Sequence, residues 1–213
     1  MASQRRKIDM KLGKSMRYMP ENIRGSFPIR YRIIRRSIKH PRLELWGSEL
    51  RIIIPKNANP LKVIRENRSW IIRQIEFVRE ARRIAEKLEL VPRTRRKFKA
   101  LVEKIAQEYA KMLGIKLGKV RIRKMKTCWG SCSSSGNITI NRDAQYLPEN
   151  LIRYLVYHEL CHLIRWSHDR EFHKLIAERF PDYRDLDLQL QAYWIKLSEK
   201  ASENRGGVIG SAN

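Results

Sequence analysis

The histidines constrain this chain more than any other feature, because four of the five lie within sixteen residues. The first two bracket the segment His158-Glu159-Leu160-Cys161-His162, which has the H-E-x-x-H spacing. On a helix this spacing places two imidazoles on one face, where they can hold a zinc ion and leave its other positions open. Glu159 points to a different side, so it can act on a water at the metal instead of binding the ion.

The residues before the motif predict a helix that begins near Pro148, because proline and glutamate suit the first turn of a helix. Buried histidines and a buried glutamate need polar partners, and a bound metal supplies them. The alternative is a helix whose histidines form ordinary hydrogen bonds inside the core. Apolar residues at helical spacing indicate that this helix is largely buried, and they are Leu151, Ile152, Leu155, Val156, Leu160 and Leu163.

His168 is the expected third ligand. It follows the motif by six residues, which is the spacing of metzincin proteases. The chain departs from that class, since Arg165 replaces the glycine of the metzincin turn and no methionine follows the motif. His168 is preferred because a second helix is expected to begin beside it. His173 and a carboxylate, Glu171 or Glu178, remain as alternatives.

Three segments together resemble the YgjP-like metallopeptidase family, which is similar to the WLM and SprT groups of zinc peptidases. The likeness extends from about Ser26 to Phe180, which is most of the chain. It names no substrate. The segments that carry it are Thr127–Ser133, Gly136–Asn141 and His158–Leu163, the last followed by His168 and Phe172.

The resemblance implies a zincin-like fold with Glu159 as the catalytic residue. Two positions depart from the family pattern, since Cys128 stands where an arginine is expected and His173 stands where a tryptophan is common. The second departure argues against His173 as a metal ligand. The zinc site that the resemblance implies consists of His158, His162 and His168.

Two strands are expected around the segment Trp129-Gly130-Ser131-Cys132. Residues Gly118–Arg123 alternate apolar with basic side chains, and Asn137–Asn141 alternate polar with apolar ones. We expect these strands to pair as a hairpin beside the motif helix. If the second strand lies at the edge of a cleft, its free backbone can receive an extended peptide by strand addition. Two interpretations of Trp129 have equal weight, a role at that cleft or a place in the core.

The three cysteines predict no disulfide framework, because their number is odd. The sequence shows no secretory signal and no apolar run of membrane-spanning length. Together these features predict a cytoplasmic protein without a membrane partner. Cys128 and Cys132 form a C-x-x-x-C pair, for which a structural metal site is an alternative to ordinary buried thiols. Cys161 lies between the motif histidines and is expected to pack in the core.

The formal net charge is +24, and its distribution is uneven. Residues 1–126 contain 36 lysines and arginines and 11 acidic residues, whereas residues 127–213 contain 10 and 11. This asymmetry predicts that the basic half binds a polyanionic partner, nucleic acid or a ribonucleoprotein. The alternative is a strongly charged surface that is only solvated. The basic run expected to contribute to the binding surface consists of Arg93, Arg95, Arg96 and Lys97.

The sequence predicts an α+β fold in which a small basic region precedes a zincin-like core. Residues 1–25 are basic, weakly patterned and expected to be flexible. Residues 26–92 are expected to form the basic region, with a β-hairpin and a long helix. Residues 93–200 are expected to form the catalytic core, and residues 201–213 a polar tail.

Hydrophobic periodicity and turn residues predict the individual elements. A long helix is predicted from Pro60 to about Glu89, where the apolar pattern stops before Pro92. Two helices of the core are expected, one that ends near Leu113 and one over Leu186–Leu197. The strands of the basic region are expected at Ile29–Ile38, Arg42–Trp46 and Leu50–Ile54.

Two functions fit these features. A zinc-dependent metallopeptidase would use the metal to polarise a peptide carbonyl and Glu159 as the general base for the attacking water. Its substrate would be a protein or a peptide. A nucleic-acid-binding protein with a structural or vestigial zinc site is the second function. A peptidase that acts on or near nucleic acid would combine the two.

Overall fold

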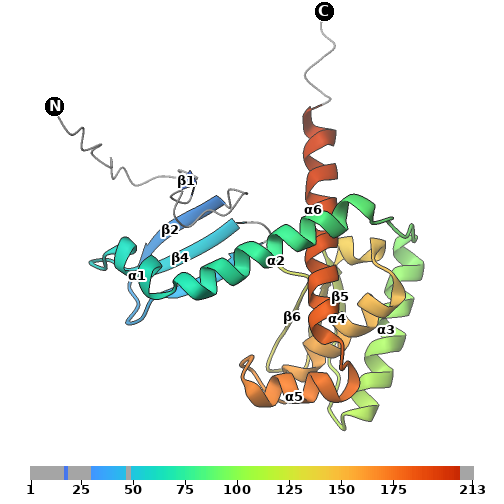
Figure 1. Ribbon diagram of the computed structural model, residues 1–213. Helices are drawn as coiled ribbons and strands as arrows, with labels where there is room; N and C mark the ends of the chain where they lie inside the picture. Colours follow the sequence, from blue (N-terminus) through green and yellow to red (C-terminus); the bar gives the residue numbers. More distant parts are fainter. Residues whose placement is uncertain (1–16, 19–29, 47–48, 207–213) are drawn as a thin grey trace, which may run out of the picture. The chain divides into compact units, whose positions relative to one another are not determined.

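The computed structural model describes residues 17–18, 30–46 and 49–206 (Figure 1). The chain divides into two compact units, Met1–Ile72 and Arg73–Asn213. Most of the segment 1–25, which is expected to be flexible, lies outside the described residues. The exception is a short strand at residues 17–18. The domain limits expected from the sequence stay a prediction.

The first unit contains a four-stranded mixed sheet with the strand order β1-β2-β4-β3. Strands β2 and β4 are parallel, whereas β1 with β2 and β3 with β4 are antiparallel. The strands expected in this region are confirmed, and the ends of each lie within two residues of the expected ones. The bounds are Arg17–Tyr18 for β1, Arg30–Arg36 for β2, Arg42–Trp46 for β3 and Glu49–Pro55 for β4.

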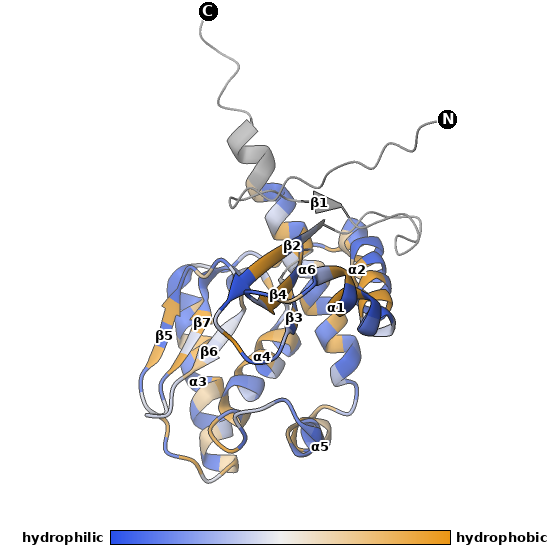
Figure 2. Ribbon diagram, turned by 90° about the vertical axis from the view of Figure 1, so that its left-hand side faces the viewer, coloured by the Kyte–Doolittle hydropathy of each residue, from blue (hydrophilic) through white to orange (hydrophobic). Residues whose placement is uncertain are grey.

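One face of this sheet is apolar because side chains alternate along each strand. Ile33 of β2 and Leu43 of β3 both lie opposite Ile52 of β4, so these three side chains share a face. Figure 2 shows apolar residues, in orange, on β2 and β4. The side chains of Leu50, Ile52 and Ile54 are fully buried and form the centre of this unit.

The single long helix predicted after the sheet is interrupted, which corrects that prediction. Helix α1 spans Pro60–Glu66 and helix α2 spans Arg68–Lys87. The break lies at Asn67, whose side-chain Nδ2 donates to the carbonyl of Val63 at 2.8 Å. An asparagine that bonds the backbone of the preceding turn competes with continuation of the helix, so a new helix starts at the next residue.

The second unit contains a three-stranded sheet with the order β5-β7-β6, where β5 spans Val120–Arg123, β6 Gly130–Cys132 and β7 Ile138–Asn141. The predicted hairpin of β5 with β7 is wrong, because these two strands pair in parallel. The hairpin partner of β7 is β6, which reverses through a turn where Gly136 has a φ of 77°. β7 is therefore the central strand, and β5 and β6 form the two edges.

Helix α4 lies at the centre of the second unit, where it contacts α3, α5, α6 and β6. The helix expected to end near residue 113 and the helix expected over 186–197 are both present, and α6 extends six residues into the expected polar tail. Residues 207–213 lie outside the described residues. The α+β prediction is confirmed. The helices are α3 Arg95–Met112, η2 Arg142–Tyr146 (a 3-10 helix), α4 Glu149–Cys161, α5 Arg170–Arg179 and α6 Tyr183–Gly206.

The core of the second unit is built from the inner faces of these helices and of the sheet. No helix in the described part of the chain combines the length and apolar character needed to cross a membrane. The largest fully buried side chains of this core are Phe98, Ile105, Ile138, Ile140, Leu147, Tyr154 and Phe172.

Candidate metal centre

Helix α4 presents the first two histidines of the motif. His158 lies in its last turn, and His162 is the residue that ends it, with helical dihedral angles of −64° and −18°. The chain then leaves the helix, because the backbone N–H groups of Ile164 and Arg165 both donate to the carbonyl of Cys161. This tight turn leads the chain back toward the histidines.

The third histidine is placed by the start of α5. His168 directly precedes Asp169, the N-cap of this helix, whose side chain accepts from the N–H of Phe172 at 3.0 Å. A capped helix start fixes the backbone at this point. The Nε2 atoms of His158 and His168 are 3.1 Å apart. One ring nitrogen from each of His158, His162 and His168 lies within 4.8 Å of the others.

A hydrogen bond to the backbone fixes the ring orientation of His162. Its Nδ1 lies 3.3 Å from the carbonyl oxygen of Arg165, which leaves Nε2 as the free ligand atom when Nδ1 carries the proton. Arg165 stands where metzincins have glycine, and here its backbone carbonyl contacts the imidazole of His162. The ring of Phe172 stacks on His162 at 4.8 Å, and it meets the rings of His158 and His168 edge-on at 5.1 and 4.7 Å.

The three imidazoles are held in the neutral form that binds metals. Burial and the neighbouring histidines lower the pKa of His158 to about 3. Burial also lowers the pKa of His162, although its hydrogen bonds to the backbone oppose the shift, and it lowers the pKa of His168. Close neutral ring nitrogens with one free lone pair each suit a divalent cation, and a set of three matches the ligand number of catalytic zinc sites.

The structure places the alternative ligands outside this group. His173 lies on α5 with its ring 6.4 Å from that of His168, and it stacks on Tyr183 at 5.6 Å. Glu171 and Glu178 are exposed on the same helix. Within the described residues, the group of close ligand atoms therefore contains the three expected histidines and none of the alternatives.

Glu159 is buried beside the histidines, with only 6% of its surface exposed. Burial raises the pKa of its carboxyl group to about 8. A Cβ atom built on Gly130 would lie 2.4 Å from Glu159 Oε1 and 2.6 Å from its Cδ, so the backbone of β6 lies directly against the carboxylate. Sequence reasoning missed this role of Gly130. Its only signal was the Trp-Gly-Ser-Cys segment, which does not reveal what the glycine faces.

Trp129 anchors the beginning of β6. Its Nε1 donates to the carbonyl of Leu190 in α6 at 3.2 Å, and its ring meets Trp194 edge-on at 5.1 Å. Of the two interpretations of Trp129, these contacts favour packing. Because Trp129 precedes Gly130 in the chain, the anchor also fixes the position of the backbone that lies against Glu159.

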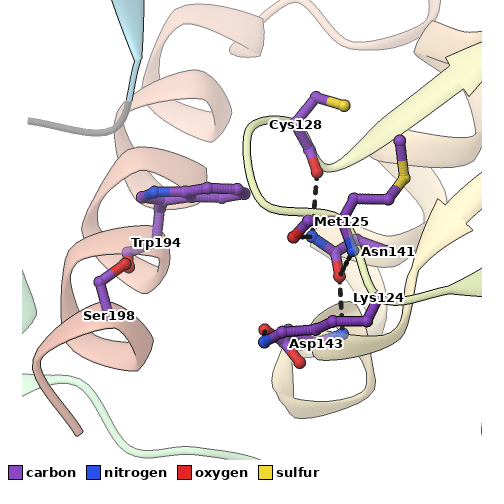
Figure 3. Close-up of polar contacts among 7 residues, drawn as sticks. All are labelled: Lys124, Met125, Cys128, Asn141, Asp143, Trp194 and Ser198. Carbon is purple, nitrogen blue, oxygen red and sulfur yellow. Dashed lines mark hydrogen bonds and ion pairs between the residues drawn. The ribbon is translucent and has the colours of Figure 1, made fainter. Parts of the chain in front are cut away.

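Asn141 organises the loop that leads into β6, another role that the sequence did not indicate. Its side chain is 1% exposed, and its Nδ2 donates to the carbonyls of Met125 and Cys128 at 3.0 and 2.9 Å (Figure 3). Its Oδ1 accepts from the N–H groups of Met125 and Asp143. These bonds pair four backbone groups in a partly buried setting, where a polar group without a partner is costly.

A second layer of contacts lies behind His158. Tyr154, one turn earlier on α4, has its ring 6.1 Å from that of His158, and its hydroxyl donates to Asp187 Oδ1 at 2.6 Å. Burial raises the pKa of the Asp187 carboxyl group, while the bond from Tyr154 lowers it. The pair connects α4 to α6 behind His158.

The cysteines are free, as expected. Burial raises the pKa of the Cys132 thiol to about 11 and that of the Cys161 thiol to about 12, so both are protonated at neutral pH. Cys161 is fully buried in the core, which confirms the expectation that it packs there. Neither Cys128 nor Cys132 belongs to the group of close ligand atoms in the described residues.

Residues 35–193 match the model of the family described as YgjP-like, metallopeptidase domain. Two solved structures are similar to part of the chain. The metallopeptidase zymogen of Pyrococcus abyssi abylysin is 30% identical, covers 41% of this chain and 87% of its own, and has a TM-score of 0.37. The metallopeptidase zymogen of Methanocaldococcus jannaschii jannalysin is 22% identical, covers 42% of this chain and 92% of its own, and has a TM-score of 0.39. No protein of curated function matches the chain.

Proposed function

The chain belongs to the YgjP-like metallopeptidase family, and from this premise we propose a zinc-dependent hydrolysis of peptide bonds with Glu159 as the general base. The observation that supports it most is the convergence of His158, His162 and His168 beside one buried carboxylate. Three histidines leave a tetrahedral zinc ion one open position, the arrangement of catalytic sites rather than structural ones.

The zinc ion and Glu159 would have different roles in the reaction. When bound, zinc would supply a Lewis acid that polarises the scissile carbonyl and makes a water easier to deprotonate. Glu159 would take the proton of the attacking water and pass it to the leaving amine. Burial raises the pKa of its carboxyl group to about 8, and a cation held by the histidines would lower that pKa toward the charged form that a base requires.

The open edge of β6 is the expected position of the substrate. β6 is an edge strand, so one side of its backbone has no partner among the described strands. Gly130 of this strand lies against Glu159, so a peptide at this edge would lie near the proposed general base. An extended peptide that adds to this edge would have its backbone held by strand hydrogen bonds. The free backbone expected at β7 is therefore assigned to β6 instead. The three free cysteines fit a reducing compartment, so we expect the activity in the cytoplasm.

Removal and return of the metal tests this function. A chelator should abolish hydrolysis of a mixed set of fluorogenic peptides, and stoichiometric zinc should restore it, because no protein group replaces the Lewis acid. Hydrolysis that continues without metal would contradict the proposal. Complete absence of hydrolysis in the zinc-loaded protein would instead favour the second candidate, a nucleic-acid-binding protein with a structural zinc site.

A further inference from the structure

Five lysines and arginines on the helices α1, α2 and α3 have an acidic partner on the same helix. Pairs of this kind, three or four residues apart on an exposed helix face, are ordinary features of a solvated surface and contribute little energy. The charge of these five residues therefore does not by itself require a partner molecule. The pairs are Lys62–Glu66, Arg79–Glu76, Arg83–Glu80, Lys99–Glu103 and Lys104–Glu108.

Arg93, in the run expected to bind a polyanion, makes hydrogen bonds within the fold. Its guanidinium donates to the backbone carbonyls of Gln145 and Leu147. These bonds hold the segment before α3 to the chain that enters α4. A change of Arg93 would therefore disturb the fold, which makes it unsuitable for a test of binding.

The segment Lys111–Lys126 differs from the helices, because it contains seven basic residues and no acidic one. Lys124 is paired with Asp143. The other six basic residues form no ion pair with any residue in the described parts of the chain. Like charges this close repel one another, and here no acidic side chain of the segment offsets the repulsion.

Strand β5 aligns three of these residues on one face. Val120 and Ile122 pack against the core, so the side chains between and beside them point to the other face of the sheet. The ladder with β7 continues through the backbone of Lys119, which extends the alternation by one residue. Lys119, Arg121 and Arg123, here named the basic row, thus follow one another about 6.6 Å apart along the strand.

Hydroxyl groups lie beside the basic row. Thr139 of β7 is directly opposite Arg121, and Ser131 of β6 is directly opposite Thr139. Guanidinium, ammonium and hydroxyl groups are the side-chain donors that bind phosphate oxygens of nucleic acids. The opposite face of the same sheet carries Gly130, which contacts Glu159. A ligand on the basic row would therefore leave the catalytic side of the sheet free.

We propose that the basic row is a docking surface for the phosphate backbone of a nucleic acid. Charged side chains, especially lysine, protect an edge strand from pairing with another chain. The basic row carries three cations, and Lys116 and Lys126 lie three residues beyond its ends in the sequence, which is more charge than one protective side chain supplies. Nucleic acid is favoured over an acidic protein because its dense charges release bound counterions when lysine and arginine replace them.

Salt-dependent binding of the full-length chain to a short labelled DNA duplex tests the proposal, with fluorescence anisotropy as the readout. Lys119→Thr, Arg121→Thr and Arg123→Thr together remove the basic row and keep residues that favour strands. Each lost phosphate contact reduces the log–log slope of affinity against salt by about 0.9, so the triple variant should have a slope shallower by about 2.7. Arg121→Lys with Arg123→Lys should retain the slope, because it retains the charges.

The matched control removes the same net charge from paired helix positions, through Arg83→Gln, Lys99→Gln and Lys104→Gln. It should leave the slope unchanged, because these side chains already have partners. Peptide hydrolysis should be unchanged in both variants, so a failure of this proposal can be distinguished from a failure of the proposed peptidase function. Circular dichroism verifies folding. If the triple threonine variant is misfolded, the single variant Arg123→Thr replaces it in the test. Its log–log slope of affinity against salt should be shallower by about 0.9.

Three results would overturn the proposal. The first is a failure of the unaltered protein to bind the duplex even at low salt, which would leave edge protection as the role of the basic row. The second is an equal reduction of the salt-dependence slope in the control and in the triple threonine variant, which would mean that only net charge matters. The third is tighter binding of poly-glutamate than of a duplex of equal charge, which would identify an acidic protein as the partner.

Discussion

At the scale of single residues, the contact between Gly130 and Glu159 leaves the least room for change. Gly130→Ala would place a methyl group 2.4 Å from the Oε1 atom of Glu159, so the carboxylate or the strand must move. A displacement of about 1 Å can cost about 100-fold in rate, and we expect a loss of that order in kcat with zinc content retained. Steady-state kinetics and metal analysis measure the two effects.

The control for this prediction is Ser134→Ala, in the exposed turn after β6. It should leave kcat at its original value, since no catalytic group contacts this side chain. Full activity in Gly130→Ala would show that the backbone of β6 does not position the carboxylate.

Single residues also mark the limit of what the sequence predicts. The spacing of His158 and His162 follows from helix geometry, because both lie on one helix. Gly130 and Asn141 lie on strands that reach α4 only through tertiary packing. No periodicity links their positions to Glu159, so neither role is predictable from the sequence.

At the scale of elements, the start of α5 decides between two candidate ligands. His168 precedes the N-cap of this helix, whereas His173 lies more than one turn further and stacks on Tyr183. His168→Ala should therefore weaken zinc binding by orders of magnitude, while His173→Ala should change it little. Competition with a fluorescent chelator measures both affinities. The opposite order of the two variants would move the ligand role to His173.

The elements show which sequence signals are reliable. Helices α3 and α4 have long apolar periodicities, and the end of α3 and the start of α4 each lie within one residue of the expected position. The break at Asn67 depends on one side-chain hydrogen bond, which periodicity does not detect. The pairing of β5 with β7 differs from the predicted hairpin because strand order depends on the short strand β6, which lies between them in the sequence. The glycine and serine of β6 give little strand signal.

At the scale of the whole molecule, the metal-free protein should be most stable near pH 6.5. The folded-state pKa of His158 is lowered to about 3 from 6.5, so its contribution is present above pH 6.5 and is lost as the pH falls toward 3. The pKa of Glu159 is raised to about 8 from 4.5, so its contribution is present below pH 4.5 and is lost as the pH rises toward 8. Between pH 4.5 and 6.5 these two effects oppose each other, and the lowered pKa values of His162 and His168 tip the balance toward higher pH.

Urea unfolding at a series of pH values, with the chelator present, measures this dependence. The free energy of unfolding should fall on each side of the maximum by an amount on the order of a few kcal/mol. Glu159→Gln should remove the decline between pH 6.5 and 8 and should make the decline from pH 6.5 to 4.5 steeper, because the opposing effect of Glu159 is then absent. A decline on the alkaline side that persists in this variant would assign it to another group.

The central claim is that Glu159 acts as a base in a zinc-dependent peptidase, and the turnover of Glu159→Gln at full zinc occupancy tests it most directly. The amide keeps the size of the side chain but cannot accept the proton of the attacking water. We predict that the variant binds zinc as the unaltered protein does and loses about 10²- to 10⁴-fold in kcat. Undiminished turnover at equal zinc content would contradict the claim.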